Sequence, residues 1–204
     1  MINIQVLHKS GSCLQEWIYD DINELSDSRQ INFTRISGDE FDADIIVCRH
    51  PINRLISQYY GSWSSHLGDE SYKKKIQSQA LKEWILNKSR LLYTKRLYDS
   101  IFSLRKVHIV RYEDMMDNPK LFLSFILDNI NKLDLLDVLY DKYKGEFAFG
   151  NKDLSKDIQN GLVSHRRILD HKEYLHKFTD IEIKFINNIL QDVLVKYDSV
   201  QSFI

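Results

Sequence analysis

The stretch DIIVCRHPINRLISQYY, residues 44–60, decides the fold class of this chain. Its first five residues, 44–48, form a short β-branched run that is typical of a parallel strand covered on both faces. Pro51 follows almost at once, and proline is favoured in the first turn of a helix. The apolar residues after it repeat at intervals of three and four as far as Trp63, which is the spacing of an amphipathic helix. The stretch therefore predicts a buried strand that leads directly into a helix.

The same alternation extends to both sides of this stretch. Residues 3–7 and 31–36 are predicted as strands, and the helix between them carries Leu14, Trp17, Ile18, Ile22 and Leu25 on one side. Toward the C-terminus the pattern predicts a helical region over 72–104, with a break near 87–90, and then a strand over 107–110. A helix that Pro119 opens and Asn118 caps follows this strand. The rest of the chain is predicted to contain a polar loop within 142–171 and a last helix over 180–197.

Strands that alternate with helices indicate the α/β class, and we expect a three-layer α/β/α fold with a central parallel sheet. The 204 residues amount to one domain of about 150 residues with some excess, so residues 1–204 are expected to form a single domain. In such folds ligands bind at the carboxyl ends of the strands. The strand ends at 8–14, 48–54 and 111–114 are therefore the places where a functional site is expected.

The composition excludes several classes of protein. Apolar residues make up 43% and charged residues 28% of the chain, which is close to an ordinary globular protein and unlike a collagen-like, low-complexity or wholly disordered one. No stretch approaches 18 uncharged apolar residues and no signal peptide is visible, so we expect a cytoplasmic protein that does not bind a membrane. Cys13 and Cys48 have no metal-ligand spacing, so no metal site is expected.

Charge is balanced overall but unevenly distributed. The chain has 28 basic and 29 acidic residues, yet residues 71–111 contain eleven Lys or Arg against only Glu83 and Asp99. The basic residues wrap around the predicted helix instead of forming one stripe. This pattern favours a solvated helical surface over a local anionic partner, and it does not support nucleic-acid binding.

The first strand end, HKSGSCL at residues 8–14, has the features of a phosphate-binding turn. Gly11 between two serines permits a tight turn, whose backbone amides and following helix N-terminus can surround a phosphate. Lys9 adds a mobile positive charge. The turn lacks the G-x-x-x-x-G-K-[ST] pattern that holds Mg-ATP, so it suits a phosphate without suiting Mg-ATP. A purely structural turn remains the alternative interpretation.

The second strand end offers a second anion-binding pair. Arg49 leaves the predicted strand where it can face the same crevice, and Ser57 lies about two turns into the helix that Pro51 begins. Two phosphate-binding positions on adjacent strands indicate a bisphosphorylated nucleotide. The alternatives are a strand-end salt bridge for Arg49 and an exposed helical serine for Ser57.

Four segments in order, HKSGSCL, RHPINRLISQYYGSW, RYEDMMDNPK and SHRRILDHKEYLHKFT, resemble the sulfotransferase family that uses 3′-phosphoadenosine 5′-phosphosulfate (PAPS). The resemblance spans residues 2–185. Its most specific part is Arg-x-Pro after a strand with a serine eight residues beyond the arginine, in a style closer to the carbohydrate sulfotransferases. The resemblance implies a P-loop-like sulfotransferase fold, PAPS as co-substrate and adenosine 3′,5′-bisphosphate as product.

The resemblance also implies roles for individual residues. Lys9 and the backbone amides of the turn would bind the 5′-phosphosulfate, with Lys9 stabilising the charge that grows on the leaving oxygen. Arg49 and Ser57 would bind the 3′-phosphate, and the basic pair Arg166 and Arg167 would add contacts to it. The expected donor-binding set is Lys9, Ser10, Gly11, Ser12, Cys13, Leu14, Arg49, Ser57, Arg166 and Arg167. Glu113 and Asp114 match the acidic pair of the family, and we expect them to fix the turn and neighbouring basic groups.

The general base is where this chain departs from the family pattern. Many relatives have Gly-His shortly after the second strand, whereas this chain has Gly38-Asp39. Asp39 is the first choice for the base, because a carboxylate beside the acceptor hydroxyl can take its proton. Glu40 and His66 are the alternatives, and Asp39 can also be read as an ordinary turn residue. Lys9, Asp39 and Ser57 thus form the expected catalytic set.

Cys13 stands where relatives commonly have a hydroxyl residue. A thiolate is favoured at a helix N-terminus beside a lysine, so the hypothesis is that oxidation or alkylation of Cys13 impairs donor binding. The alternative is a small buried residue.

The sequence therefore predicts a PAPS-dependent sulfotransferase that transfers a sulfuryl group to a hydroxyl, or less readily an amine, by direct in-line displacement without a metal. The acceptor is either a small molecule or a glycan, and the oligomeric state is left open. Two other functions stay in view: a P-loop kinase or related phosphotransferase, and a nucleotide-binding scaffold without catalytic activity.

Overall fold

The computed structural model describes residues 1–7, 10, 12–36, 40–64, 81–148 and 178–203, apart from the side chains of residues 12, 60–64, 81 and 148. The chain divides into two compact units. The first unit comprises Met1–His50, Ser100–Phe149 and Lys196–Ile204, and the second comprises Pro51–Asp99 and Gly150–Val195. The expectation of a single domain over residues 1–204 stays a prediction.

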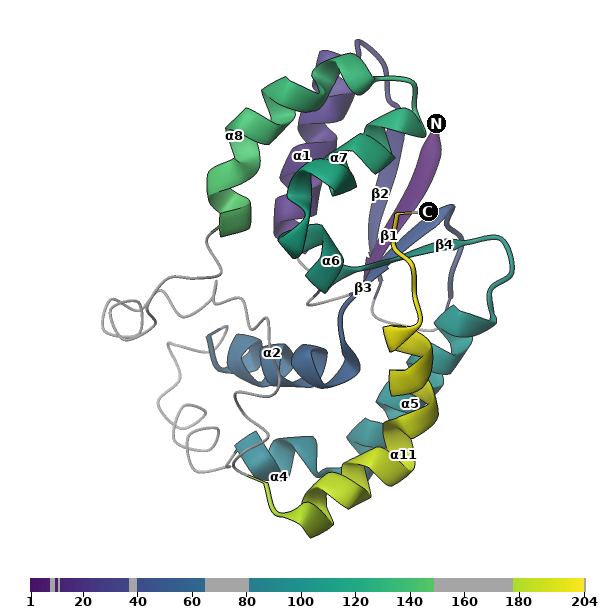
Figure 1. Ribbon diagram of the computed structural model, residues 1–204, viewed down its shortest axis with the longest axis vertical. Coiled ribbons are helices and arrows are strands. Elements are labelled where there is room, and N and C mark those ends of the chain that lie inside the picture. The colour runs from purple at the N-terminus through teal and green to yellow at the C-terminus, as the bar shows by residue number, and fades with distance from the viewer. Residues whose placement is uncertain (8–9, 11, 37–39, 65–80, 149–177, 204) are drawn as a thin grey trace. The chain divides into compact units, whose positions relative to one another are not determined.

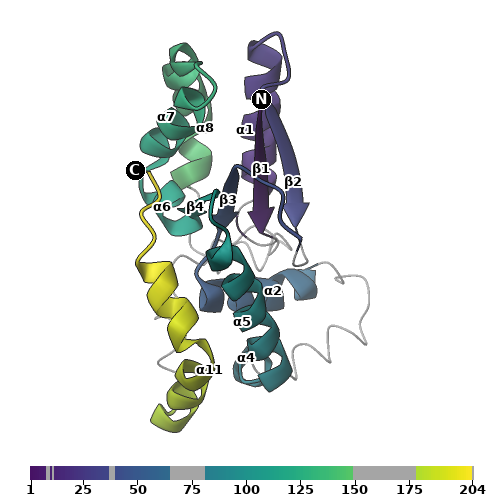
Figure 2. The ribbon, with the colours of Figure 1, turned by 90° about the vertical axis from the view of Figure 1, so that its right-hand side faces the viewer.

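A four-stranded parallel sheet lies at the centre of the first unit, with strand order β2-β1-β3-β4 (Figure 1). Its strands are β1 (Ile2–Leu7), β2 (Ile31–Ile36), β3 (Ile45–Cys48) and β4 (His108–Arg111). Figure 2 shows β1 and β2 side by side with their arrowheads at the same end. Every strand predicted from the sequence is present within one residue of its expected bounds, so the α/β class with a parallel sheet is confirmed.

One face of this sheet is apolar and is covered by α1 (Ser12–Leu25). Ile4 lies opposite Phe33 in the register, and the Phe33 ring packs against Tyr19 of α1 with 5.5 Å between ring centroids. Burial raises the pKa of the Tyr19 hydroxyl far above its usual range. The apolar side of the predicted helix is narrower than expected, because Trp17 is 51% exposed and Leu25 is 47% exposed. Both residues continue the helical spacing but lie beyond the area that the sheet covers.

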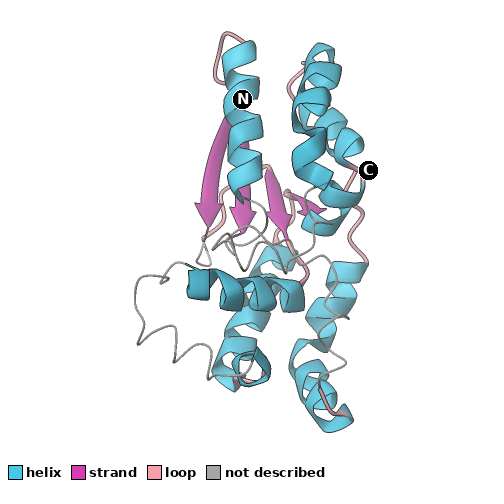
Figure 3. Ribbon diagram, turned by 90° about the vertical axis from the view of Figure 1, so that its left-hand side faces the viewer, coloured by secondary structure: helices cyan, strands magenta, loops and turns pink. Residues whose placement is uncertain are grey.

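The opposite face of the sheet is polar at its β1–β2 half. The Asn32 side chain donates to Asn3 Oδ1 at 3.1 Å, and the Asp42 amide donates to Gln5 Oε1 at 3.1 Å. Figure 3 shows the helices (cyan) beside the strands (magenta). The contacts described for the first unit put α1 on the apolar face, so the third layer of the expected α/β/α arrangement stays a prediction.

Four short elements follow β4 in the first unit. They are α6 (Tyr112–Asp117), α7 (Pro119–Asp128), the 3₁₀ turn η1 (Leu133–Leu135) and α8 (Leu136–Ala148). The Phe125 ring of α7 lies 4.5 Å from the His108 ring of β4. The Tyr143 hydroxyl of α8 lies 2.8 Å from Asp21 Oδ2 and 3.0 Å from the Trp17 carbonyl oxygen. These contacts attach α7 to the sheet and α8 to α1.

Residues 142–148 belong to α8, in which Tyr143 and Phe147 are buried on one side. The polar loop was predicted within 142–171, and residues 149–171 lie outside the described ranges, so that loop stays a prediction. One prediction for this region was wrong in part. Asn118 occupies the N-cap position of α7, but its side chain makes no capping hydrogen bond. Its backbone instead hydrogen-bonds to both neighbouring helices. The Asn118 amide donates to the Asp114 carbonyl oxygen of α6, and the Asn118 carbonyl oxygen accepts from the Phe122 amide of α7.

The second unit is built from helices around one apolar cluster. These helices are α2 (Pro51–Ser64), α4 (Leu81–Ile85), most of α5 (Lys88–Ser103) and most of α11 (Asp180–Asp198). The predicted break near 87–90 falls at 86–87. The buried members of the cluster are Ile52, Leu55, Ile56, Ile85, Leu91, Phe178, Ile186 and Leu190. The helices of the second unit are therefore held by apolar side chains at the spacing that the sequence predicted.

Two sets of polar contacts stabilise the edge of this cluster. Trp84 Nε1 donates to the Leu55 carbonyl at 3.2 Å, and the Arg90 guanidinium stacks on the Trp84 ring at 3.4 Å. At the start of α11, Thr179 and Glu182 cap each other: Glu182 Oε2 accepts from the Thr179 amide at 2.8 Å, and the Glu182 amide donates to Thr179 Oγ1 at 3.4 Å. Among the described helices, none is long and apolar enough to cross a membrane.

Candidate functional site

The predicted site residues divide into those that the structure describes and those that it does not. Lys9, Gly11, Asp39, Arg166, Arg167 and the alternative base His66 lie outside the described residues. Ser10, Cys13, Leu14, Arg49, Ser57 and Glu40 are described, and for Ser12 the backbone is. Glu40 is exposed. The described residues therefore include part of the expected donor-binding set and, of the three candidate bases, Glu40.

The turn between β1 and α1 is tied to the helix that follows it. The Ser10 amide donates to the Leu7 carbonyl at 2.9 Å, and the Ser10 carbonyl accepts from Gln15 Nε2 at 2.8 Å. Gln15 is itself held by the Tyr19 hydroxyl, which donates to Gln15 Oε1 at 3.0 Å. Ser10, Gln15 and Tyr19 are fully buried. The position of Ser10 is thus fixed by polar groups inside the unit.

This geometry changes the set of amides that can bind an anion. The Ser10 amide was expected to contact the phosphosulfate, but its hydrogen bond to Leu7 already occupies it. Ser12, Cys13 and Leu14 form the first turn of α1, where backbone amides have no acceptor within the helix. The Ser10 hydroxyl is buried and has no hydrogen-bond partner among the described residues. The first amides of α1 and the Ser10 hydroxyl are therefore available hydrogen-bond donors at the N-terminus of a 14-residue helix. Helix N-termini of this kind commonly bind anions in proteins.

Cys13 is exposed, so its interpretation as a small buried residue was wrong. Arg35 Nη2 of the neighbouring strand β2 lies 3.9 Å from Cys13 Sγ, and Arg35 also forms an ion pair with Glu16. The thiol therefore has a cation beside it at the N-terminus of α1. The effect of Cys13 modification on donor binding stays a prediction.

Arg49 follows β3 directly and is only 3% exposed. Its Nε lies 4.0 Å from Glu113 Oε1, and its guanidinium carbon lies 4.7 Å from the centre of the Tyr112 ring. A buried arginine needs such partners, because an isolated charge is costly to remove from water. If Arg49 serves only in a strand-end salt bridge, Glu113 is its partner. Ser57 is half-buried on α2 and belongs to the second unit, so its cooperation with Arg49 stays a prediction.

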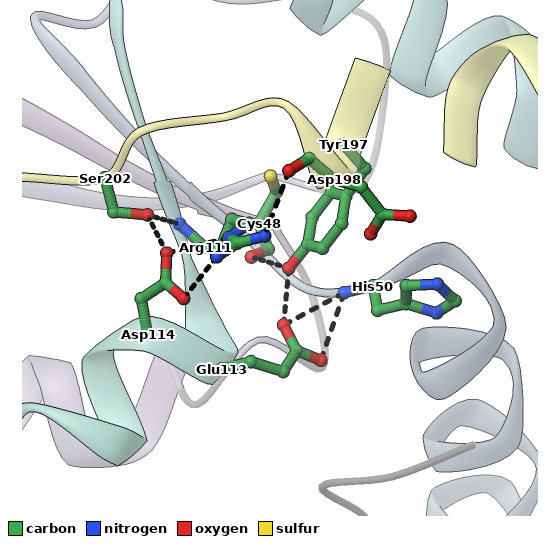
Figure 4. Close-up of polar contacts among 8 residues, drawn as sticks. All are labelled: Cys48, His50, Arg111, Glu113, Asp114, Tyr197, Asp198 and Ser202. Atoms are coloured by element: carbon green, nitrogen blue, oxygen red, sulfur yellow. Dashed lines mark hydrogen bonds and ion pairs between the residues drawn. The ribbon is translucent and has the colours of Figure 1, made fainter. Parts of the chain in front are cut away.

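The acidic pair after β4 is held by several polar groups of the first unit (Figure 4). Glu113 accepts from the His50 amide, which lies 3.2 Å from each carboxylate oxygen, and from the Tyr197 hydroxyl. Asp114 forms a two-pronged pair with Arg111, with N–O distances of 2.7 and 2.6 Å. This hydrogen bonding raises the pKa of the Arg111 guanidinium. The pair thus holds its basic neighbours, as the sequence predicted, but it lies in the first turn of α6 and not in a loop.

The C-terminal segment completes this network, and sequence reasoning missed it. Ser202 Oγ donates to Asp114 Oδ2 at 2.5 Å and accepts from the Arg111 amide at 2.9 Å. His108 Nε2 lies 2.6 Å from the Ser202 carbonyl oxygen. Tyr197 is 2% exposed, and its hydroxyl also lies 3.4 Å from the Cys48 carbonyl oxygen. The only sequence signal for Tyr197 was its place at the end of an amphipathic helix, which does not identify a polar role.

Comparison with known proteins adds no relative to this picture. No family model matches the chain, and no match was found among curated proteins or solved structures. The function must therefore be argued from the residues themselves.

Proposed function

We propose that this protein is a PAPS-dependent sulfotransferase that transfers a sulfuryl group to a hydroxyl of a small molecule or glycan. The observation that supports it most is the pairing of β1 with β3. These strands are neighbours, they are parallel, and Val6 lies opposite Val47 in the register. The first turn of α1 and Arg49 therefore follow adjacent strands at the same edge of the sheet. A helix N-terminus and a buried arginine at one edge suit a ligand with two anionic groups.

The roles of the described residues follow from their chemistry. The amides of Ser12, Cys13 and Leu14 would bind the 5′-phosphosulfate, while Arg49 and Ser57 would bind the 3′-phosphate. Lys9 would also bind the 5′-phosphosulfate and stabilise the charge that grows on the leaving oxygen, while Arg166 and Arg167 would add contacts to the 3′-phosphate. The departing nucleotide carries its own negative charge, so these cations would stabilise it electrostatically.

The reaction itself requires little covalent work from the protein. The acceptor oxygen attacks sulfur in line with the bond to the bridging phosphate oxygen, and that S–O bond breaks as the new one forms. Asp39 would take the proton of the acceptor hydroxyl, with Glu40 and His66 as the alternatives. The products are the sulfate ester, adenosine 3′,5′-bisphosphate and one proton. Positioning and charge stabilisation supply the rate enhancement.

Nucleotide binding by the full chain tests this proposal. Isothermal titration with adenosine 3′,5′-bisphosphate, with adenosine 5′-monophosphate and with ATP plus magnesium should give the tightest binding for the bisphosphate. The expected preference over the monophosphate is about tenfold or more, because one charge-assisted contact to the 3′-phosphate contributes about 1.4 kcal/mol or more. Transfer of labelled sulfate from PAPS to a panel of sugars and phenols then tests the reaction.

Other results would point to the competing functions. A preference for ATP plus magnesium would indicate a phosphotransferase, and tight bisphosphate binding without transfer to any acceptor would indicate a catalytically silent binder.

A further inference from the structure

The Tyr197 hydroxyl belongs to a polar network beside Arg49. It reaches Glu113 Oε2, and its ring packs edge-on against His50 with 5.5 Å between centroids and an interplanar angle of 89°. Glu113 in turn lies next to Arg49. Glu113 therefore links Tyr197 to Arg49.

The distance between Glu113 and Arg49 is informative. A hydrogen-bonded pair of a cation and a carboxylate has an N–O distance of about 2.7–2.9 Å, whereas Arg49 Nε lies 4.0 Å from Glu113 Oε1. Two donors, the His50 amide and the Tyr197 hydroxyl, hold the carboxylate at this position. Glu113 thus attracts the guanidinium without closing a short hydrogen bond to its Nε. A carboxylate freed from one donor could rotate toward Arg49 and compete with an incoming anion.

We propose that Tyr197 is a positioning residue: by holding Glu113 Oε2, it keeps Arg49 oriented toward the 3′-phosphate of the bound nucleotide. The inference rests on the proposed function, because it takes the 3′-phosphate as the ligand of Arg49. Neither the family resemblance nor the sequence pattern pointed to this residue.

A second interpretation is that Tyr197 only anchors the C-terminal segment. Ser202 provides the matched control, because it belongs to the same segment and binds the same turn. Its hydroxyl contacts Asp114 and the Arg111 amide, and it makes no described contact with Glu113 or Arg49. If the segment matters only as an anchor, the loss of either hydroxyl should have the same consequence for nucleotide binding.

The experiment compares Tyr197→Phe and Ser202→Ala with the parent chain by isothermal titration. Each protein is titrated with adenosine 3′,5′-bisphosphate and with adenosine 5′-monophosphate, so that the ratio of the two dissociation constants reports the contact to the 3′-phosphate. In Tyr197→Phe the ratio should fall about fivefold, as expected for one lost hydrogen bond to a charged group acting indirectly. The monophosphate affinity should stay within about twofold, and Ser202→Ala should keep the parent ratio.

The outcomes separate the inference from the proposed function. If the parent chain does not distinguish the two nucleotides, the proposed function fails and the role of Tyr197 fails with it. If the parent distinguishes them and Tyr197→Phe does so equally well, only the role of Tyr197 is overturned. An equal fall of the ratio in Tyr197→Phe and Ser202→Ala also overturns it, since this is the signature of a mere anchor.

A second variant guards against a failure of Tyr197→Phe to fold. Glu113→Gln keeps an oxygen that can accept from the His50 amide and the Tyr197 hydroxyl but removes the charge that orients Arg49. The ratio should fall in this variant as well. A raised ratio would mean that Glu113 only competes with the phosphate, and it would overturn the inference.

Discussion

The turns after β1 and after β4 belong to the same unit but use their polar groups differently. After β4, Glu113 and Asp114 accept hydrogen bonds from an amide, a phenol, a guanidinium and a hydroxyl of the protein itself. After β1, the Ser10 hydroxyl is buried without a partner among the described residues, and the first amides of α1 have no acceptor within the helix. The segment after β4 is thus the more highly charged of the two, yet its charged groups are bound by the protein itself. The donors at the start of α1 are therefore the ones that an anionic ligand can use.

The largest expected effect comes from the turn after β1. Lys9→Ala should lower the rate of sulfuryl transfer by about 100-fold or more, the usual consequence of losing one donor to a developing negative charge. Thermal unfolding should be nearly unchanged, because the buried contacts of Ser10 with Gln15 and of Gln15 with Tyr19 remain in this variant. Steady-state rates and melting curves measure both quantities. Lys144→Ala, which removes an exposed lysine paired with Asp141, is the control. Full activity in Lys9→Ala would contradict a catalytic role for the segment after β1.

The turn after β4 should show the reverse behaviour. Asp114→Ala leaves Arg111 and Ser202 without their shared acceptor, so the free energy of unfolding should fall by about 2 kcal/mol. The folded variant should bind adenosine 3′,5′-bisphosphate within about threefold of the parent. Urea denaturation and titration supply the two measurements. Asp117→Ala, an exposed residue of the same helix, should leave stability unchanged. A variant with parental stability but no nucleotide binding would reverse the roles of the two turns.

A smaller effect is expected from the pH dependence of stability in the second unit, where the carboxylate of Glu182 is also bound by groups of the protein itself. Lys82 Nζ lies 2.8 Å from Glu182, and this contact, with the hydrogen bonds from Thr179, lowers the pKa of Glu182 to about 2 from an ordinary value of 4.5. Because the pKa is lower in the folded state, the contribution to stability is complete above pH 4.5 and is lost as the pH falls toward 2. Urea unfolding between pH 6 and pH 2 should show this loss, and Glu182→Gln should reduce the slope. An identical slope in the variant would exclude Glu182 as its source.

The smallest expected effect concerns the thiols. Cys13 is exposed and Cys48 is fully buried, so an alkylating reagent should modify the native chain once, at Cys13. Adenosine 3′,5′-bisphosphate should slow this reaction several-fold, because its phosphate would lie at the first turn of α1. Mass spectrometry of timed samples measures both the site and the rate. Labelling that is indifferent to the nucleotide would separate Cys13 from the donor site.

Local patterns predicted the elements that repeat regularly. β2 was placed at its observed bounds because residues 31–36 form an uninterrupted strand pattern, and α2 began at Pro51 because proline pre-sets the first helical turn. The missed elements lack such signals. Helix α8 has a weak apolar period, since only one side of it contacts α1. The capping pair of Thr179 and Glu182 is an exception, because its T-x-x-E spacing is a recognisable helix-start signal.

The candidate site was predictable only where it depends on sequence neighbours. Arg49 was located by its place after a strand, and the acidic pair by its place after β4. The contacts of Tyr197 and Ser202 could not be found in this way, because they join residues 84 and 88 positions apart. Such pairs are created by the tertiary fold, and no periodicity records them.

This separation in sequence has a consequence for synthesis. The ribosome adds Tyr197 and Ser202 only 84 and 88 residues after the carboxylates that they bind. Until then Arg111 and Asp114 can pair with each other, but Glu113 lacks its phenol and Ser202 has yet to dock. Contacts between residues so far apart in the chain form more slowly than local ones. All four strands are thus synthesised before the arginine beside them can acquire its final setting.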